Sequence, residues 1–374
     1  MTMIDTMKPF IQEAWDKAGF NELTPIQQQA LPLLIEGKDV LAQSPTGTGK
    51  TLAYLLPLLQ NVQHDATHVQ AIILATSHEL VMQIYAELQV WAAGSGITLA
   101  SFIGGVNMKR QLEKLKKRPQ IVVGTPGRIH ELIKLKKLKV HEVKTIVLDE
   151  GDQLLLSEQN NTVQDIVKST LAERQVALFS ATMSPQIIDA AMQLMNDPEI
   201  IRVKDIPASF QVTHGYIICD DPRDKLDVLR RIANIPGAKV LAFGTNIGQL
   251  NMQVEKLKYR DMHVGILHSE TKKEDRAQSI RDFKTGKINL LVASDVAARG
   301  LDIKGITHVV NYDLPKDVTQ YAHRSGRTGR LGSEEGTVIS IITERDERLL
   351  KRIVNERNIP LQHMMIKHSK LMNV

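Results

Sequence analysis

The chain has 374 residues, of which 43% are hydrophobic and 24% are charged, as in soluble globular proteins long enough for two domains. No apolar run is long enough to span a bilayer, the N-terminus carries no secretory signal, and the single cysteine, Cys219, excludes an internal disulfide. We therefore expect a cytoplasmic protein that does not bind membranes.

The positive charge is concentrated in the second half of the chain. Residues 1–204 hold 20 basic and 21 acidic side chains, and the remaining residues hold 27 and 21. A basic half is compatible with a polyanionic partner. Aromatic residues make up only 4% of the chain, so backbone contacts rather than base stacking would dominate any binding of nucleic acid.

Short apolar segments alternate with helical stretches along the whole chain. Continuous apolar strands separated by helices indicate parallel sheets covered on both faces, which is the α/β fold class. The pattern restarts after residues 205–213, where Pro207 and small side chains indicate a linker, so we predict domains over 1–204 and 214–374. A last helix is predicted over 344–356, shortly before the chain ends. The predicted strands are 39–43, 71–76, 98–104, 120–125, 145–150, 176–182, 214–219, 239–245, 263–268, 289–295, 307–313 and 337–343.

The segment AQSPTGTGKT, residues 42–51, follows a predicted strand and precedes an apolar helix, as a phosphate-binding loop does. Glycines in the loop let backbone N–H groups approach phosphate oxygens, and the helix N-terminus adds partial positive charge. Lys50 can reach the β- and γ-phosphates, and the Thr51 hydroxyl can bind Mg²⁺. Ser44 stands where such loops usually begin with glycine. The residues expected to bind nucleotide here are Ser44, Pro45, Thr46, Gly47, Thr48, Gly49, Lys50 and Thr51.

Three acidic residues follow the predicted strand 145–150 in the sequence Asp149-Glu150-Gly151-Asp152. Ligands of parallel sheets bind at the carboxyl ends of the strands. Asp149 can hold Mg²⁺ directly or through water, and Glu150 can orient and deprotonate an attacking water. A solvated acidic turn is the alternative, and the phosphate loop upstream argues against it.

Further segments carry a family signature: GFNELTPIQ (19–27), the pair Gly104-Gly105, TPGR (125–128), SAT (180–182), AFGTN (242–246), VASDVAARGLD (292–302) and HRSGRTGR (323–330). With them, nearly the whole chain resembles the DEAD-box ATP-dependent RNA helicases of helicase superfamily 2. The resemblance implies two tandem RecA-like domains, RNA-stimulated hydrolysis of ATP with Mg²⁺, and RNA as the partner.

The resemblance also implies roles for single residues around the nucleotide. Phe10 would stack on adenine and Gln27 would bind its edge, although helix packing with Ala14 and Ala18 also accounts for Phe10. A phosphate loop in one domain and an arginine cluster in the other make hydrolysis depend on closure. The other implied roles are ribose contact for Asp302, catalysis for His323, arginine fingers for Arg327 and Arg330, and coupling of ATP to RNA for Asp152, Ser180 and Thr182.

RNA contacts on the backbone and 2′-hydroxyls are implied, so sequence preference should be low. Basic clusters at 109–118 and 134–139 are either solvated faces or extensions of the RNA track. The residues implied to contact RNA are Ser77, His78, Gly104, Gly105, Thr125, Pro126, Gly127, Arg128, Arg276 and Ser294.

Several positions depart from the family pattern. His78 stands where arginine is usual, and a neutral imidazole lacks the charge and donor fork of a guanidinium, so we predict a weaker phosphate contact. Ser294 replaces threonine and keeps the hydroxyl, and Lys273 replaces glutamine. Gly151 replaces the alanine of the family's DEAD sequence, and we predict that Gly151→Ala is neutral or stabilising by about 0.4–1 kcal/mol where the backbone allows alanine.

These observations favour a monomeric ATP-dependent RNA helicase that locally unwinds structured RNA, with ribosome assembly as its setting by family analogy alone. One alternative is an ATP-gated RNA clamp or annealing factor with little unwinding. Another is a DNA helicase, against which the motifs at 19–27, 180–182 and 323–330 argue. A nonenzymatic scaffold would predict losses at Lys50, Glu150 or Arg327, and all three are present.

Overall fold

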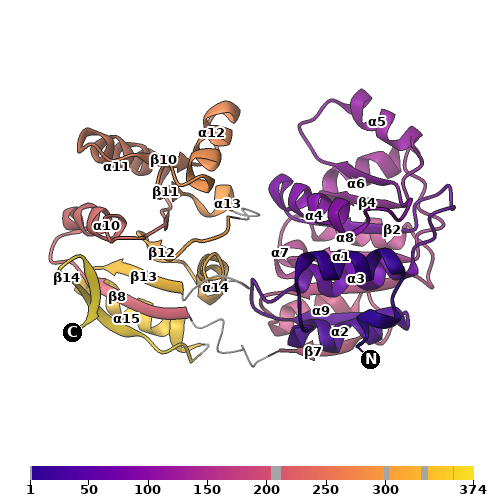
Figure 1. The fold of residues 1–374 in the computed structure, drawn as a ribbon, viewed down its shortest axis with the longest axis horizontal. Helices are drawn as coiled ribbons and strands as arrows, with labels where there is room; N and C mark the ends of the chain where they lie inside the picture. Colours follow the sequence, from indigo (N-terminus) through magenta and orange to yellow (C-terminus); the bar gives the residue numbers. More distant parts are fainter. Residues whose placement is uncertain (1, 204–211, 299–302, 330–335, 357) are drawn as a thin grey trace. The chain divides into compact units, whose positions relative to one another are not determined.

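The computed structural model describes residues 2–203, 212–298, 303–329, 336–356 and 358–374. They form two compact units, Met1–Lys204 and Asp205–Val374, each with its own sheet (Figure 1). Residues 205–211 of the expected linker 205–213 lie outside the described residues, and the second unit's first strand begins at Val212.

The first unit contains a seven-stranded sheet in the order β3-β4-β2-β5-β6-β1-β7, and every pairing in it is parallel. Parallel strands buried on both faces are apolar throughout, which is why the sequence pattern located six of the seven. The strands are β1 (Val40–Gln43), β2 (Ala71–Leu74), β3 (Leu99–Phe102), β4 (Ile121–Gly124), β5 (Thr145–Asp149), β6 (Gln175–Ser180) and β7 (Glu199–Arg202).

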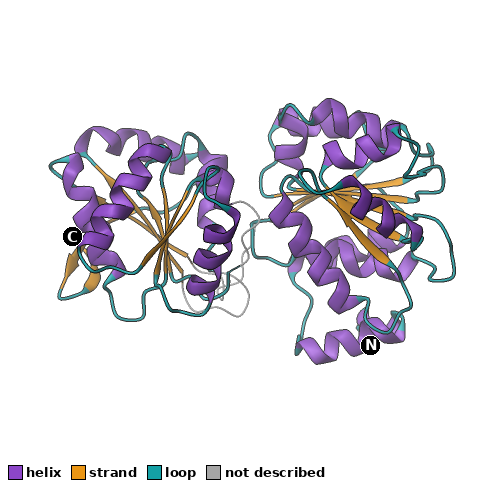
Figure 2. Cartoon of the chain, turned by 90° about the horizontal axis from the view of Figure 1, so that it is seen from above, coloured by secondary structure: helices purple, strands orange, loops and turns teal. Residues whose placement is uncertain are grey.

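Helices cover both faces of this sheet, and Figure 2 shows its strands as a layer between helices. Alternate side chains of a strand point to opposite faces, so in β2 Ile73 packs into one core and Ile72 and Leu74 into the other. The first core includes α1 (Pro9–Ala18), α2 (Pro25–Ile35), α3 (Lys50–Asn61) and α4 (His78–Trp91); the second includes α5 (Met108–Lys116), α6 (Pro126–Lys134), α7 (Gly151–Leu156), α8 (Asn160–Lys168) and α9 (Pro185–Met192).

The second unit contains an eight-stranded sheet in the order β10-β11-β9-β12-β13-β8-β14-β15, in which only the β14–β15 pairing is antiparallel. Two sheets of mainly parallel strands between helices confirm the predicted α/β class. The strands are β8 (Val212–Ile218), β9 (Val240–Phe243), β10 (Val264–Leu267), β11 (Leu290–Ala293), β12 (His308–Asn311), β13 (Gly336–Ile342), β14 (Gln362–Lys367) and β15 (Lys370–Asn373).

This sheet also lies between two layers of helices. Within the described ranges, no helix combines the length and apolar character needed to cross a membrane. One core includes α10 (Lys225–Ala233) and α11 (Ile247–Tyr259); the other includes α12 (Lys273–Lys284), α13 (Asp295–Ala298), α14 (Val318–Ser325) and α15 (Glu344–Asn355).

The arrangement of strands in the first unit brings the predicted site residues to one edge. Strand β6 lies between β1 and β5, with Gln43 paired to Ser180 and Asp149 paired to Phe179. The phosphate loop after β1, the acids after β5 and the SAT segment after β6 therefore emerge side by side at the carboxyl edge of the sheet.

Candidate active site

The phosphate loop joins β1 to α3 and depends on its glycines. Gly47 and Gly49 have φ angles of 83° and 91°, a left-handed conformation that favours glycine. A Cβ at Gly49 would also lie 2.6 Å from Nε2 of Gln27. The loop therefore brings its backbone N–H groups to the start of α3, where the helix dipole favours an anion.

Polar side chains hold this loop from inside. The fully buried Ser44 hydroxyl donates to Oγ1 of Thr48 at 2.6 Å, and Thr48 donates to the Pro45 carbonyl at 2.7 Å. The Lys50 ammonium donates to the carbonyl oxygens of Ser44 and Pro45, both at 2.7 Å. Ser44 thus replaces a glycine and supplies a hydrogen bond that a glycine would lack.

Gln27 is buried and joins α2 to the phosphate loop. Its Oε1 accepts a hydrogen bond from the Thr24 backbone N–H at 3.0 Å, which caps α2, and its Nε2 donates to the Gly49 carbonyl at 3.2 Å. The amide expected to contact adenine therefore lies directly beside the loop expected to contact the phosphates.

Phe10 is half-buried on α1 and packs against the first core. The buried residues of that helix are Ile11 and Trp15; Phe10 and Ala14 are partly buried and pack against the same core, whereas Ala18 is exposed. Because α1 packs against α3 and α4 around Ile11 and Trp15, helix packing accounts for part of the surroundings of Phe10, as the alternative expects. Phe10 is therefore only partly buried by these contacts.

Trp15, Phe20 and Trp91 form an aromatic cluster that the sequence pattern did not predict. Phe20 is 39% exposed, lies parallel to Trp91 with ring centroids 6.3 Å apart, and meets the edge of Trp15 at 5.2 Å. Phe20 begins the segment that leads to Gln27, and these ring contacts hold the start of that segment against α1 and α4. Its membership in GFNELTPIQ was the available signal.

Asp149 ends β5 and is buried. Its Oδ2 accepts a hydrogen bond from the Tyr54 hydroxyl at 2.8 Å, and its Oδ1 accepts one from the Glu150 backbone N–H at 2.9 Å. Burial, with the nearby Glu150 charge, raises the pKa of Asp149 to about 6, although the Tyr54 hydrogen bond and Lys50 act in the opposite direction. Burial and the Asp149 charge raise the pKa of Tyr54 well above its ordinary value, so Tyr54 remains a donor.

Glu150 lies between β5 and α7 in a strained conformation. Its φ is 54°, a left-handed conformation that costs a residue with a side chain about 1–2 kcal/mol. The Thr76 hydroxyl donates to Oε2 of Glu150 at 2.6 Å. Thr76 therefore fixes the direction of the carboxylate that was predicted to act on water, and it was not assigned a role from the sequence.

The three residues predicted to couple ATP to RNA lie together. The Thr182 hydroxyl donates to Oδ2 of Asp152 at 2.7 Å, and the Thr182 backbone N–H donates to the Ser180 hydroxyl oxygen at 3.1 Å. The Ser180 carbonyl also accepts from the Ser44 backbone N–H at 3.0 Å. A continuous set of hydrogen bonds thus connects the acids after β5, the segment after β6 and the phosphate loop.

Gly151 has no space for a side chain. Its φ is not in the left-handed region, but a Cβ there would lie 2.4 Å from Cδ2 and 2.5 Å from Cγ of Leu178, which is fully buried in β6. The prediction that Gly151→Ala would be neutral or stabilising is therefore wrong. Backbone conformation alone suggested it, whereas packing against Leu178 decides the outcome.

The donor set at this edge suits a hard cation. Within the described residues, no group of three or more His, Cys, Asp or Glu side chains could hold a metal. Oxygen atoms are available on the Thr51 hydroxyl and on the buried Asp149 carboxylate. Mg²⁺ characteristically takes one or two protein oxygens and completes its shell with water and substrate phosphates, so these residues fit it.

Two residues predicted to contact RNA begin α4, beside the glycine pair. Ser77 caps this helix by accepting a hydrogen bond from the Leu80 backbone N–H at 3.2 Å, and His78 is its first residue. A Cβ at Gly104 would lie 3.5 Å from Nε2 of His78, and one at Gly105 would lie 3.9 Å from its Cε1. The loop after β3 thus passes directly over the His78 ring.

The TPGR segment begins the neighbouring helix α6, with Thr125 as its cap residue, Pro126 at its first position and Gly127 after it. Arg128 lies next, with its Nε 3.2 Å from a Glu131 carboxylate oxygen. Strands β2 and β4 are paired in parallel, so α4 and α6 begin at the same sheet edge. Their N-termini carry partial positive charge toward any phosphate bound there.

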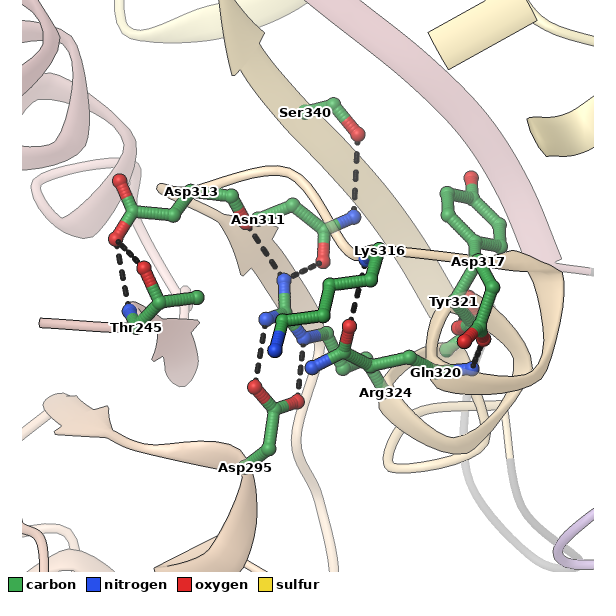
Figure 3. A network of polar contacts seen from close by, with 11 residues as sticks. Thr245, Asp295, Asn311, Asp313, Lys316, Asp317, Gln320, Tyr321, Arg324 and Ser340 are labelled. Atoms are coloured by element: carbon green, nitrogen blue, oxygen red, sulfur yellow. Dashed lines mark hydrogen bonds and ion pairs between the residues drawn. The ribbon is translucent and has the colours of Figure 1, made fainter. Parts of the chain in front are cut away.

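In the second unit, one buried arginine joins three of the signature segments (Figure 3). Arg324 is 1% exposed and donates to both carboxylate oxygens of Asp295, at 2.6 and 2.7 Å. It also donates to Oδ1 of Asn311 at 3.1 Å and to the Asp313 carbonyl at 2.6 Å. The Asp313 carboxylate in turn accepts two hydrogen bonds from Thr245. Arg324 therefore serves the architecture of the unit, a role that the spacing of arginines did not distinguish.

The remaining predicted residues of this unit lie around that network. Arg327 is buried just after α14, and His323 is half-buried in its last turn. Arg276 donates to the Ala297 carbonyl at 2.8 Å and so ties α12 to α13. Ser294 lies between β11 and α13, with its backbone N–H bonded to the Leu267 carbonyl. Two further predicted residues, Asp302 and Arg330, lie outside the described residues.

The first unit has a phosphate loop and paired acids at the edge of a parallel sheet, and a second unit with a mainly parallel sheet follows it. This combination is that of a helicase core. Residues 24–190 match the family model of the DEAD/DEAH box helicases, and residues 224–332 match the helicase conserved C-terminal domain. The chain is 50% identical to the DEAD-box ATP-dependent RNA helicase CshC of Bacillus cereus over 96% of its own length and 91% of that protein. It is 49% identical to the probable ATP-dependent RNA helicase YfmL of Bacillus subtilis, over 97% and 96% of the two chains.

Solved structures are also similar to this chain. Dbp5 of S. cerevisiae, bound to RNA and ADP BeF3, is similar with a TM-score of 0.87 and 29% identity, over 96% of this chain and 94% of that one. Mss116p, bound to ssRNA and AMP-PNP, has a TM-score of 0.83 and 26% identity, over 96% and 77%. The chain belongs to the DEAD-box family of ATP-dependent RNA helicases, which confirms the family, the tandem RecA-like fold and the enzyme class expected from the sequence.

Proposed function

We propose that this protein binds ATP with Mg²⁺ at the carboxyl edge of its first sheet and uses hydrolysis to open short RNA duplexes. It acts as a monomer in the cytoplasm and contacts RNA through the backbone with little sequence preference. The observation that carries the proposal is the hydrogen-bonded set Ser44, Ser180, Thr182 and Asp152, which joins the phosphate loop to the acids.

The roles proposed for the ATP site rest on the motif residues and are supported by their contacts. Lys50 and the loop N–H groups bind the phosphates, and Thr51 and Asp149 would hold Mg²⁺, which neutralises charge on the phosphate oxygens when bound. Glu150, held by Thr76, orients and deprotonates the attacking water. Arg327 is proposed to act on the γ-phosphate as an arginine finger.

RNA as the substrate is supported by the solved relatives, since both Dbp5 and Mss116p were captured with RNA. On this chain, the helix N-termini of α4 and α6 and the glycine loop at Gly104 offer backbone donors at one sheet edge. Such donors bind phosphates regardless of base identity, which supports low sequence preference.

The test measures ATP hydrolysis with RNA, with DNA and without nucleic acid, together with displacement of a strand from a short RNA duplex. RNA should stimulate hydrolysis more than DNA does. Lys50→Ala should abolish productive use of ATP, and Arg327→Ala should slow hydrolysis while ATP still binds. Equal stimulation by DNA would contradict the RNA assignment.

Glu150→Gln separates hydrolysis from RNA release. This variant should bind ATP, hydrolyse it slowly and hold RNA, because release is proposed to follow hydrolysis. Rapid RNA release at saturating ATP would contradict that coupling. RNA-stimulated hydrolysis without strand displacement would favour an ATP-gated clamp or annealing factor.

The RNA target is proposed by family analogy to be a large structured RNA, such as that of assembling ribosomal particles. Crosslinking the protein to RNA in cells and sequencing the bound fragments tests this directly. Fragments spread over unrelated messages, with no enrichment of ribosomal RNA, would contradict it.

A further inference from the structure

One buried phenol contacts one of the two residues proposed to hold Mg²⁺. Tyr54 lies one turn after Thr51 on α3, and its hydroxyl donates to Oδ2 of Asp149 at 2.8 Å across 95 residues of sequence. Tyr54 therefore connects the helix that follows the phosphate loop to the acidic residue at the end of β5 by a hydrogen bond.

We propose that Tyr54 is a positioning residue for the cation of this site, which orients the Asp149 carboxylate through its hydroxyl. The inference rests on the proposed function, because it concerns the Mg²⁺ that accompanies ATP. It adds a residue that neither the phosphate-loop pattern nor the acidic motif contains.

The direction of the hydrogen bonds is what makes Tyr54 suitable. A phenol has one proton to donate, and a carboxylate oxygen that accepts it keeps a lone pair for a cation. Tyr54 directs this proton to Oδ2 of Asp149, while Oδ1 is oriented by the Glu150 backbone N–H. Groups that hold metal ligands in place in this way set ligand orientation and basicity.

Packing alone does not require the hydroxyl. The Tyr54 side chain is 1% exposed, and its ring packs at a tilt against Phe179 of β6 with centroids 5.3 Å apart. A phenylalanine ring would make the same apolar contacts, and it would spare the cost of burying a polar group. The hydroxyl is thus the part of Tyr54 that addresses the site, and Tyr54→Phe removes it alone.

The experiment measures binding of fluorescently labelled ADP by the full chain as Mg²⁺ is increased from zero, and again in EDTA. In Tyr54→Phe, the Mg²⁺ concentration at half effect should rise about 10-fold, as for other residues that orient metal ligands. Affinity in EDTA should stay as in the wild type, because the phosphate loop is untouched. Tyr85→Phe on α4 is the matched control, since the Tyr85 hydroxyl makes a long hydrogen bond of 3.5 Å to the Leu99 carbonyl of β3; both measurements should stay unchanged.

A double-mutant cycle with Asp149→Asn excludes a purely structural effect. In that background, Tyr54→Phe should no longer shift the Mg²⁺ dependence, because the hydroxyl has lost the carboxylate that it orients. An unchanged Mg²⁺ dependence in Tyr54→Phe, or an equal shift in both backgrounds, would overturn the inference. A wild-type chain whose ADP binding is indifferent to Mg²⁺ would instead overturn the proposed function.

Folding of each variant is checked by its thermal midpoint and by tryptophan fluorescence. If Tyr54→Phe lowers the thermal midpoint, Tyr54→Met provides a second test. It also removes the hydroxyl, and its flexible apolar side chain can fill the same space. Both variants should shift the Mg²⁺ dependence in the same direction, and opposite shifts would overturn the inference.

Discussion

Gly151, the first residue of α7, lies directly against Leu178 of β6. A Cβ added at Gly151 would lie 2.4 Å from Cδ2 of Leu178. Leu178 is fully buried on β6, and its Cγ is also within 2.5 Å, so rotation of a terminal methyl cannot relieve the overlap. We predict that Gly151→Ala lowers the free energy of unfolding by about 1–3 kcal/mol, the usual cost of overpacking a core.

Tryptophan fluorescence during urea unfolding measures this effect, because Trp15 and Trp91 are the only tryptophans and both are buried in the first unit. Gly127→Ala is the control. It replaces another glycine near the start of a helix, where nothing lies within 4 Å of the added Cβ, and should be neutral or slightly stabilising. Equal stability of Gly151→Ala and the wild type would show that Leu178 moves aside at little cost.

The contrast between Gly151 and the strands shows what the sequence could and could not predict. The twelve predicted strands are present because each is a run of apolar residues that reports its own burial. β7 is an edge strand with three of its four residues exposed, so it lacks such a run. The β14–β15 hairpin turns through His368 and Ser369, both left-handed, where the usual Asn-Gly signal is absent.

The site divides in the same way. Backbone motifs such as the phosphate loop are visible in the sequence because glycines and Lys50 occur at fixed spacing. Tyr54, Thr76 and Leu178 contact the motif residues from other elements, and no local pattern marks them. The sequence of a single chain does not show which distant segments will contact each other in the fold.

The Asp149 carboxyl should make the first unit less stable as pH rises. Its pKa is raised from 3.8 to about 6, so the folded chain binds more protons than the unfolded chain between these values. Stability contributed by this group is full below about pH 4 and is lost as pH rises through about 6, to an extent of up to about 3 kcal/mol. Asp149→Asn lacks the ionisation, so its stability should change less over this window.

The measurement is urea unfolding of both proteins by tryptophan fluorescence at several pH values from 4 to 7.5. The difference in unfolding free energy between Asp149→Asn and the wild type should grow with pH and level off near pH 7. Carboxyls remote from Asp149 titrate equally in both proteins and cancel in this difference, whereas Glu150, whose charge interacts with Asp149, contributes to it. A difference that stays constant with pH would mean that Asp149 titrates at its ordinary pKa in the folded chain.

The Arg324–Asp295 pair should contribute to the second unit alone. Arg324→Met removes both hydrogen bonds that Arg324 donates to the Asp295 carboxylate, and because Asp295 is 19% exposed, the loss should stay at or below the roughly 3–5 kcal/mol of a fully buried pair. Circular dichroism should show earlier unfolding, while the tryptophan transition of the first unit should stay in place. Arg324→Met combined with Asp295→Asn should recover part of the loss, and equal loss in the single and double variants would contradict a paired role.

Replacing His78 should strengthen the proposed RNA contact. His78 begins α4 beside Gly104 and Gly105, at the carboxyl edge of the sheet. His78→Arg would add a permanent charge and a fork of donors, so RNA affinity at low salt should rise several-fold, with the slope of log affinity against log salt steeper by up to about one phosphate contact.

His64→Arg is the matched control for that measurement. His64 is exposed and precedes β2, so it lies at the amino edge of the sheet, whereas His78 follows the carboxyl end of the same strand. Both substitutions add the same charge to the same unit, and long-range attraction of RNA should therefore rise equally in both. Only a direct phosphate contact makes the His78 variant bind more tightly than the His64 variant, and equal affinities would place the RNA away from His78.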